Sequence, residues 1–83
     1  MCYFVYLLQS QVDFTFYVGY SNNPDLRLVR HNSGRSRYTS KKRPWKIVYL
    51  EKYDTKREAL IRERFLKKQR NQEFYARLIS GAG

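Results

Sequence analysis

The spacing of apolar and polar residues predicts three short strands. Tyrosine, phenylalanine, valine and leucine dominate Cys2–Gln9, and a similar run follows at Thr15–Tyr20. Residues of these types favour the pleated, half-buried surface of a sheet. The turn at Ser10–Phe14 is too short for a crossover between parallel strands, so the first two strands are expected to form a hairpin. Alternation returns over Trp45–Tyr53, which predicts the third strand.

Capping residues predict three helices. Asn23 provides an N-cap, Pro24 occupies the first helical position, and Gly34 suits the left-handed residue that follows a helix. Thr55 and Glu58 form a capping box that opens the second helix. The helices are expected over Pro24–Asn32, from Thr55 to about Lys68, and from Asn71 to Ile79.

The order of these elements is ββαβαα and indicates an α/β (α+β) fold. We expect a small three-stranded sheet, antiparallel or mixed, that is flanked by helices. Neither a repeat nor a linker-like stretch interrupts the sequence. Residues 1–83 are therefore expected to form a single domain, with a core over about 2–80 and a flexible tail at 81–83.

The charge of the chain points to a polyanionic partner. Seventeen Lys and Arg face seven Asp and Glu, which gives a formal net charge of +10. A positive excess of this size on a short chain is typical of nucleic-acid binding. The basic residues do not lie opposite an apolar face on one amphipathic helix, so no membrane partner is expected. DNA is the expected partner.

The residues expected to contact DNA lie in the loop before the third strand and near the end of the second helix. They are Arg35, Arg37, Lys41, Lys42, Arg43, Lys46, Lys67 and Lys68. Such cations attract backbone phosphates without reading sequence. Tyr38 and Trp45 could stack on exposed bases, although a tryptophan at the start of a strand is more often a core residue. This cluster predicts binding and carries no information about catalysis.

Two tyrosines of the hairpin are candidates for chemistry. With the turn centred between Gln11 and Val12, Tyr6 lies opposite Tyr17, and directly opposed side chains share one sheet face. Gly19 follows two residues later, where another group can approach the backbone closely. Spacing alone favours the simpler explanation that these tyrosines fill an aromatic core.

Three further residues suit phosphate chemistry. Arg27 and His31 are four positions apart and so share one face of the first helix, where they offer a permanent cation and a proton carrier. Glu63 lies on the apolar stripe of the second helix, and a carboxylate there needs a cation or a donor. A hard metal ion could provide the cation that this carboxylate needs. Each residue also has a simpler explanation. Arg27 could be a solvated arginine, His31 a histidine near a helix end, and Glu63 the partner in an ordinary salt bridge.

Taken together, these motifs resemble the GIY-YIG nuclease superfamily. Phe4-Val5-Tyr6 stands at the first motif and Tyr17-Val18-Gly19 at the second, and Arg27, His31-Asn32-Ser33-Gly34 and Glu63 follow in order. The resemblance covers Cys2 to about Lys68 and is closest to the small stand-alone bacterial proteins of the YhbQ-like group. Phe4 takes the place of the glycine of the first motif.

The resemblance implies a metal-dependent endonuclease that hydrolyses DNA phosphodiester bonds, on branched or single-stranded DNA in repair or recombination. It implies catalytic roles for Tyr6, Tyr17, Arg27 and His31, a structural role for Gly19, and one Mg²⁺ or Mn²⁺ ion held by Glu63. Either tyrosine could act as the general base. Two alternatives are a non-catalytic nucleic-acid-binding module with the same fold and a basic accessory of a larger complex.

The remaining expectations concern the setting of the protein. The only cysteine is Cys2, so an intramolecular disulfide is impossible, and no signal-peptide pattern stands at the start. These features predict a cytoplasmic protein. We expect a monomer, and because no separate DNA-binding domain is expected, a protein partner could supply targeting.

Overall fold

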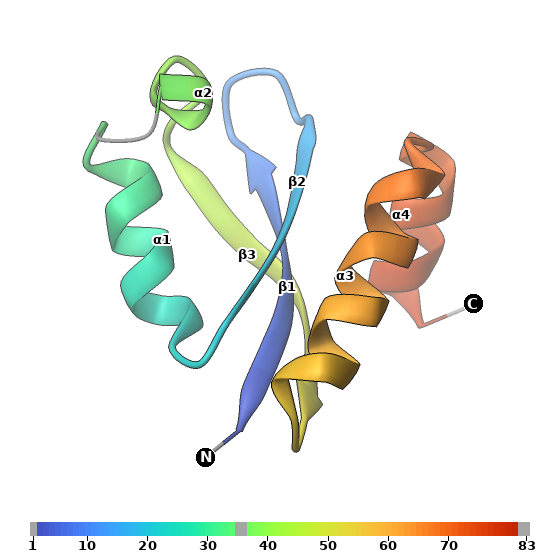
Figure 1. The fold of residues 1–83 in the computed structure, drawn as a ribbon. Coiled ribbons are helices and arrows are strands. Elements are labelled where there is room, and N and C mark those ends of the chain that lie inside the picture. Colours follow the sequence, from blue (N-terminus) through green and yellow to red (C-terminus); the bar gives the residue numbers. More distant parts are fainter. Residues whose placement is uncertain (1, 35–36, 82–83) are drawn as a thin grey trace.

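The three strands form one antiparallel sheet. The computed structural model describes residues 2–34 and 37–81, with only the backbone of residues 37 and 38. The strands are β1 (Tyr3–Ser10), β2 (Phe16–Ser21) and β3 (Trp45–Tyr53), and their order in the sheet is β2-β1-β3 (Figure 1). Both pairs are antiparallel, so of the two sheet types expected from the sequence the antiparallel one is correct.

Of the four helices in the described part of the chain, three begin at the capping residues that the sequence indicates. These are α1 (Pro24–Asn32), α3 (Lys56–Gln69) and α4 (Gln72–Ser80), and the side chains of Asn23, Thr55 and Asn71 accept backbone N–H bonds at their starts. The short α2 (Arg37–Ser40) was not expected. Among residues 2–34 and 37–81, none of the helices has the length and apolar character needed to cross a membrane.

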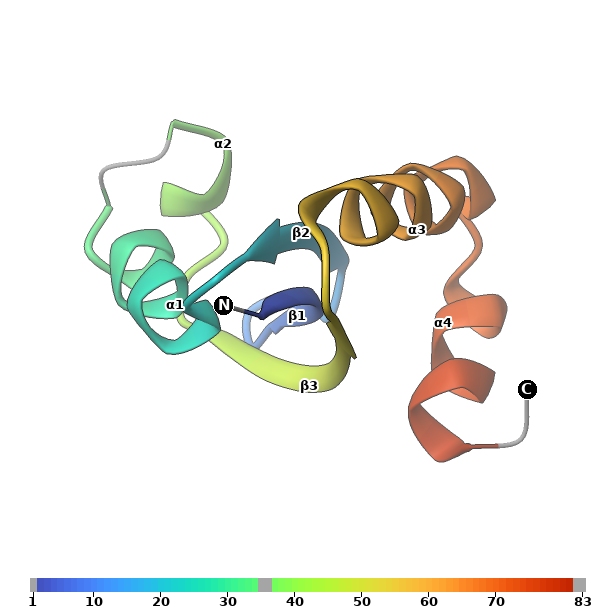
Figure 2. The ribbon, with the colours of Figure 1, turned by 60° about the horizontal axis from the view of Figure 1, so that its bottom comes forward.

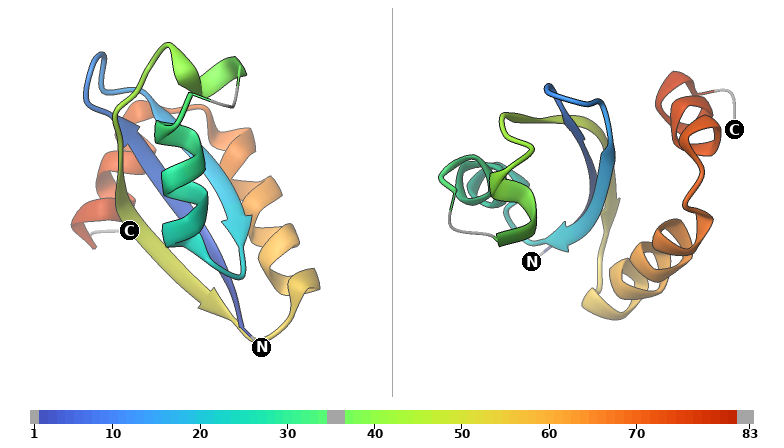
Figure 3. Two further views of the ribbon diagram at one scale, coloured as in Figure 1. Left: turned by 90° about the vertical axis from the view of Figure 1, so that its left-hand side faces the viewer. Right: turned by 90° about the horizontal axis from the view of Figure 1, so that it is seen from above.

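Helices cover both faces of the sheet. Seen along the sheet, α1 and α2 lie on one side and α3 and α4 on the other (Figure 3). Helix α3 runs beside the β2 edge, whereas α4 lies nearer β3 (Figure 2). The outer strand β2 is thus placed between α1 and α3, and side chains from both helices can meet at its edge.

Each face has its own apolar cluster. Beneath α3 and α4, Val5, Leu7 and Val18 pack with buried residues of these helices, chiefly Ala59 and Leu66. Beneath α1, the second cluster is formed by Tyr6, Leu8 and Trp45. Trp45 is only 3% exposed, so it is a core residue and does not provide a surface for base stacking.

Glu51 connects β3 to α3. Its carboxylate accepts hydrogen bonds from Tyr49 Oη at 2.6 Å and Tyr53 Oη at 2.7 Å, and from two nitrogens of the Arg62 guanidinium at 2.9 and 3.0 Å. Burial raises the pKa of Glu51, but the bonds from Arg62 and the two tyrosines together bring it below its ordinary value. Burial and the Glu51 carboxylate raise the pKa of Tyr53 to about 12. This charged pair fixes the first half of α3 against the sheet.

The hairpin register differs from the predicted one by two residues. Tyr6 lies opposite Gly19, and Tyr17 lies opposite Leu8, so the prediction that the two tyrosines face each other directly is wrong. The Ser10 N–H donates to the Thr15 carbonyl, which centres the turn one residue later than assumed. A shift of two residues leaves each side chain on its original face. Tyr6 and Tyr17 therefore still share the α1 side of the sheet.

The Tyr6 ring crosses the backbone at Gly19. A Cβ atom at Gly19 would lie 2.5 Å from Tyr6 Cζ and closer still to its hydroxyl. Only glycine leaves room for this approach. The Tyr6 side chain can thus extend from the central strand across β2 to the edge of the sheet.

Gly19→Ala should destabilise the protein by about 1–3 kcal/mol, because the added methyl group collides with a ring that is 1% exposed. Urea unfolding followed by circular dichroism would measure the change. The control is the same substitution in a Tyr6→Ala background, where the collision is removed and the cost should largely disappear. An unchanged urea midpoint for Gly19→Ala alone would contradict the close approach.

Candidate active site

A chain of hydrogen bonds links β1, α1 and the segment before β3. Tyr6 Oη lies 3.3 Å from His31 Nε2, and His31 Nδ1 lies 3.1 Å from Thr39 Oγ1. The Thr39 carbonyl in turn accepts the Trp45 indole N–H at 2.8 Å. Tyr6, His31 and Thr39 are at most 5% exposed. Because both ring nitrogens of His31 have partners, the imidazole is held in one orientation.

Tyr17 lies against the same imidazole. The ring centroids of Tyr17 and His31 are 4.9 Å apart at an interplanar angle of 61°, and Tyr17 also meets the Trp45 ring edge-on at 6.1 Å. The Tyr6 and His31 rings are 6.2 Å apart. His31 thus stands beside both candidate tyrosines, even though these are not directly opposed on the strands.

Arg27 and Glu63 reach the Tyr6 phenol from two different helices. The positive charge of Arg27 on α1 lowers the pKa of the phenol, and the Glu63 carboxylate on α3 raises it. Glu63 is 9% exposed, and its ion-pair partner Lys67, one turn later on α3, lies 3.6 Å away. The sequence allowed a salt bridge from Glu63 to an arginine, whereas the cation found there is a lysine.

The environment keeps both Tyr6 and His31 uncharged near neutral pH. Burial raises the pKa of Tyr6, and Arg27 opposes this effect only in part. Burial, followed by the positive charge of Arg27, lowers the pKa of His31 from its ordinary 6.5. A neutral imidazole carries one N–H, so His31 donates in one of its two hydrogen bonds and accepts in the other.

Glu63 is the carboxylate whose charge acts on the Tyr6 phenol. Within residues 2–34 and 37–81, no three His, Cys, Asp or Glu side chains come together as a metal-binding group. A hard divalent cation that takes one or two carboxylates and completes its shell with water and phosphate oxygens fits this donor set. The low exposure of Glu63 and its long contact with Lys67 are compatible with such a ligand.

The predicted DNA-contacting residues divide into three groups. Lys41, Arg43, Lys46 and Lys68 are exposed. Lys42 and Lys67 are already engaged, since Lys42 Nζ lies 3.2 Å from an oxygen of Asp13 and Lys67 pairs with Glu63. Arg35 lies outside the described residues, and for Arg37 only the backbone is described.

Sequence reasoning missed Thr39 and the Asn32 contact that places it. The Asn32 amide accepts the Trp45 backbone N–H at 2.6 Å and donates to the Trp45 carbonyl at 3.1 Å. These bonds join the end of α1 to the start of β3, and Thr39, which precedes β3, lies within hydrogen-bonding distance of His31 on α1. Only a contact between distant parts of the chain reveals this role, and no local pattern around Thr39 signals it.

Comparisons with known proteins give one consistent result. Residues 2–76 match the family model of the GIY-YIG catalytic domain. A UPF0213 protein of Clostridium perfringens is 42% identical over 72 residues, which cover 84% of this chain and 76% of that protein. For a UPF0213 protein of Staphylococcus epidermidis the identity is 39% over 72 residues, with 86% and 87% covered. The solution NMR structure of a UPF0213 protein from Bacillus halodurans has a TM-score of 0.59 and 30% identity, and the match covers 100% of this chain and 87% of that one.

His31 should make folding stability depend on pH below neutrality. Its pKa is lower in the folded than in the unfolded chain, so the unfolded state binds the proton more readily as the pH falls from about 6.5. The free energy of unfolding should therefore fall between pH 7.5 and 5.5, with a slope of at most about 1.4 kcal/mol per pH unit. Urea unfolding at a series of pH values measures it. The control is His31→Gln, which should remove the slope in this pH range. Glu51 and Asp13 do not contribute there, because their pKa values are lowered and they titrate at lower pH. Equal slopes in both proteins would contradict the assignment of the pH dependence to His31.

Lys41 and Lys42 provide a matched pair for testing the basic loop. Lys41→Ala removes an exposed cation and should reduce the slope of log K against log salt by about 0.7–0.9, equally for all DNA sequences. Lys42→Ala should change the slope less, because Lys42 is already paired with Asp13. Fluorescence anisotropy with a labelled oligonucleotide at several salt concentrations would measure both. Equal changes in slope would show that the ion pair does not withhold Lys42 from DNA.

Proposed function

The chain belongs to the GIY-YIG family, and on this basis we propose that it is an endonuclease that hydrolyses DNA phosphodiester bonds with the help of one Mg²⁺ or Mn²⁺ ion. The family supports a nuclease-type function. The observation that carries the proposal further is the meeting of Tyr6, Tyr17, Arg27, His31 and Glu63, from two strands and two helices, around one phenol and one imidazole. Binding alone would not require these groups to lie together.

In this proposal Tyr6 and Arg27 hold the phosphate. The raised pKa of Tyr6 keeps its hydroxyl protonated at neutral pH, so it can donate a hydrogen bond to a phosphate oxygen or position the attacking water. The Arg27 guanidinium, whose charge already acts on this phenol, stabilises the negative charge that develops on the phosphoryl oxygens. Tyr6 thus acts as a donor and positioning group.

In this proposal Tyr17 and His31 take the proton of the attacking water. Tyr17 lies against the His31 ring, and the lowered pKa of His31 leaves the imidazole neutral and able to accept a proton. We assign general-base catalysis to Tyr17 with assistance from His31. The high pKa of buried Tyr6 argues against the reverse assignment, in which the two tyrosines exchange roles.

Glu63 is the proposed metal ligand. It would hold the ion through its carboxylate, with water and substrate phosphate completing the coordination. When bound, such an ion polarises the scissile phosphate and stabilises the leaving oxygen. Lys67 partly balances the charge of Glu63, and a metal ion held by this carboxylate would compete with that ion pair.

The test compares metal-dependent cleavage by the wild type and by Glu63→Gln. This substitution keeps the shape of a side chain that is only 9% exposed but removes its charge. Cleavage of labelled single-stranded, duplex and branched DNA with Mg²⁺, Mn²⁺ or EDTA should require the metal and should fall at least about 100-fold in the variant. Glu73→Gln, which removes a charge from the exposed start of α4, is the matched control and should cut normally.

Two outcomes would overturn the proposal. Cleavage that persists in Glu63→Gln would exclude this carboxylate as the essential ligand. Salt-sensitive DNA binding without cleavage of any substrate would favour the non-catalytic nucleic-acid-binding module.

A further inference from the structure

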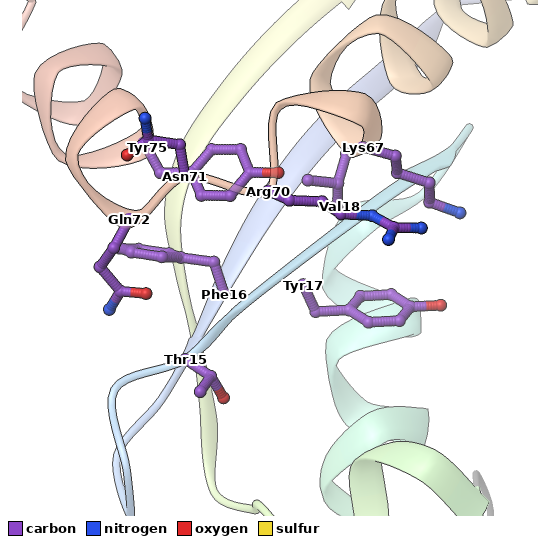
Figure 4. A pocket seen from close by; sticks show the side chains of 9 residues that line it. All are labelled: Thr15, Phe16, Tyr17, Val18, Lys67, Arg70, Asn71, Gln72 and Tyr75. Carbon is purple, nitrogen blue, oxygen red and sulfur yellow. The ribbon is translucent and has the colours of Figure 1, made fainter.

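A groove lies at the β2 edge, next to the junction of α3 and α4. Its volume is about 490 Å³, within the range of about 300–1,000 Å³ that is usual for small-ligand sites. The residues that line it are Thr15, Phe16, Tyr17, Val18, Lys67, Arg70, Asn71, Gln72 and Tyr75 (Figure 4). Its lining contains two cations, Lys67 and Arg70, and no Asp or Glu; Glu63 balances Lys67 in part, and the remaining positive charge favours an anionic ligand.

Aromatic and cationic groups occupy different ends of the groove. Phe16 and Tyr75 form an aromatic wall, with ring centroids 5.3 Å apart. The ammonium group of Lys67, the guanidinium of Arg70 and the hydroxyl of Tyr17 extend together toward the other side (Figure 4). An aromatic wall suits the flat face of a base, and two cations suit a phosphate.

Arg70 stands at a backbone position that favours glycine. It follows α3 as a left-handed C-cap with φ 44° and ψ 35°. A residue with a Cβ atom is disfavoured in this region, and glycine is the usual choice after a helix. The arginine therefore costs folding energy at this position, and its side chain reaches the groove. Binding of a ligand by the Arg70 guanidinium would explain why an arginine is kept at this position.

The groove continues into the candidate active site along two side chains. Lys67 lines the groove and pairs with Glu63, the proposed metal ligand. Tyr17 lines the groove and lies against His31. A ligand in the groove is consequently adjacent to the phosphate that the site would cleave.

We propose that this groove binds one unpaired nucleotide of the substrate strand, next to the scissile phosphate. Its base packs against Phe16, and its phosphate lies between Lys67 and Arg70. A base that is still paired within a duplex cannot enter, because its partner strand would have to follow it into a groove of nucleotide size. The inference rests on the proposed function and narrows its substrate to DNA that presents an unpaired nucleotide at the cleavage point.

The test measures binding without metal. The 5′-phosphorylated trinucleotide (dT)₃ is titrated into ¹⁵N-labelled full-length protein, and amide shifts are followed by NMR. A second ligand has the same phosphates with three abasic residues. Shifts should concentrate at Thr15–Val18 and Arg70–Gln72, and the abasic ligand should bind about tenfold more weakly because base stacking is lost.

Arg70→Gly separates the ligand-binding role from the structural one. Glycine suits the left-handed backbone, so Tm should stay the same or rise, while (dT)₃ binding should weaken about tenfold. The control is Arg57→Ala, which removes one exposed arginine from the first turn of the same helix and should change binding less than about twofold.

Several results would overturn the inference. Equal affinity for (dT)₃ and its abasic counterpart would mean that only the backbone is bound. Equal losses in Arg70→Gly and Arg57→Ala would show that the overall positive field, and not the groove, attracts DNA. Shifts confined to other residues, or no binding at millimolar ligand, would also overturn it. Since no cleavage is measured, these results are distinct from a failure of Glu63 or the metal in catalysis.

Discussion

The passage of the Tyr6 ring over Gly19 determines where the candidate site can lie. Tyr6 belongs to the central strand, and a side chain there would ordinarily remain beneath α1. The missing side chain at Gly19 lets its hydroxyl extend to the sheet edge, where it meets His31 and Arg27 of α1 and the charge of Glu63 on α3. One cross-strand approach thus connects the two helical layers, which otherwise face opposite sides of the sheet.

Buried polar groups connect several helices and strands of this protein through hydrogen bonds. Burying a hydroxyl or carboxylate is costly unless each hydrogen-bonding atom has a partner. Glu51 satisfies that requirement with Arg62 and two tyrosines, and the Thr39 hydroxyl does so with His31, while the Thr39 carbonyl accepts the Trp45 indole N–H. Among the described residues, no buried side-chain nitrogen or oxygen lacks a hydrogen bond. Such networks have strict geometric requirements and hold the surrounding elements in one arrangement.

The features that the sequence predicted are those fixed by nearby residues. Asn23, Thr55 and Asn71 cap the helices that follow them because the cap and its backbone partners are two or three residues apart. The predicted hairpin register was wrong because the turn is centred between Val12 and Asp13, one residue later than assumed. An error of one residue in the centre shifts every cross-strand pair by two.

Distant contacts explain what the sequence could not reveal about the candidate site. His31 was identified by its spacing from Arg27, but its partner Thr39 depends on how the segment after α1 folds back. In the sequence Arg70 is one more basic residue just beyond the second predicted helix, and only its left-handed backbone and its place in the groove distinguish it. Arg62 is likewise a basic residue of the second predicted helix in the sequence, and the structure shows that it is the ion-pair partner of Glu51.

The two bonds between the Asn32 amide and the Trp45 backbone have a consequence for how this surface can evolve. They close the segment between α1 and β3 at its base, so its ends stay fixed whatever lies between them. The entropy of closing a loop grows only with the logarithm of its length, about 0.6 kcal/mol for each doubling. Insertions on either side of Thr39 would therefore cost little stability and leave the imidazole in place. Selection can therefore reshape the basic surface of this fold without moving His31.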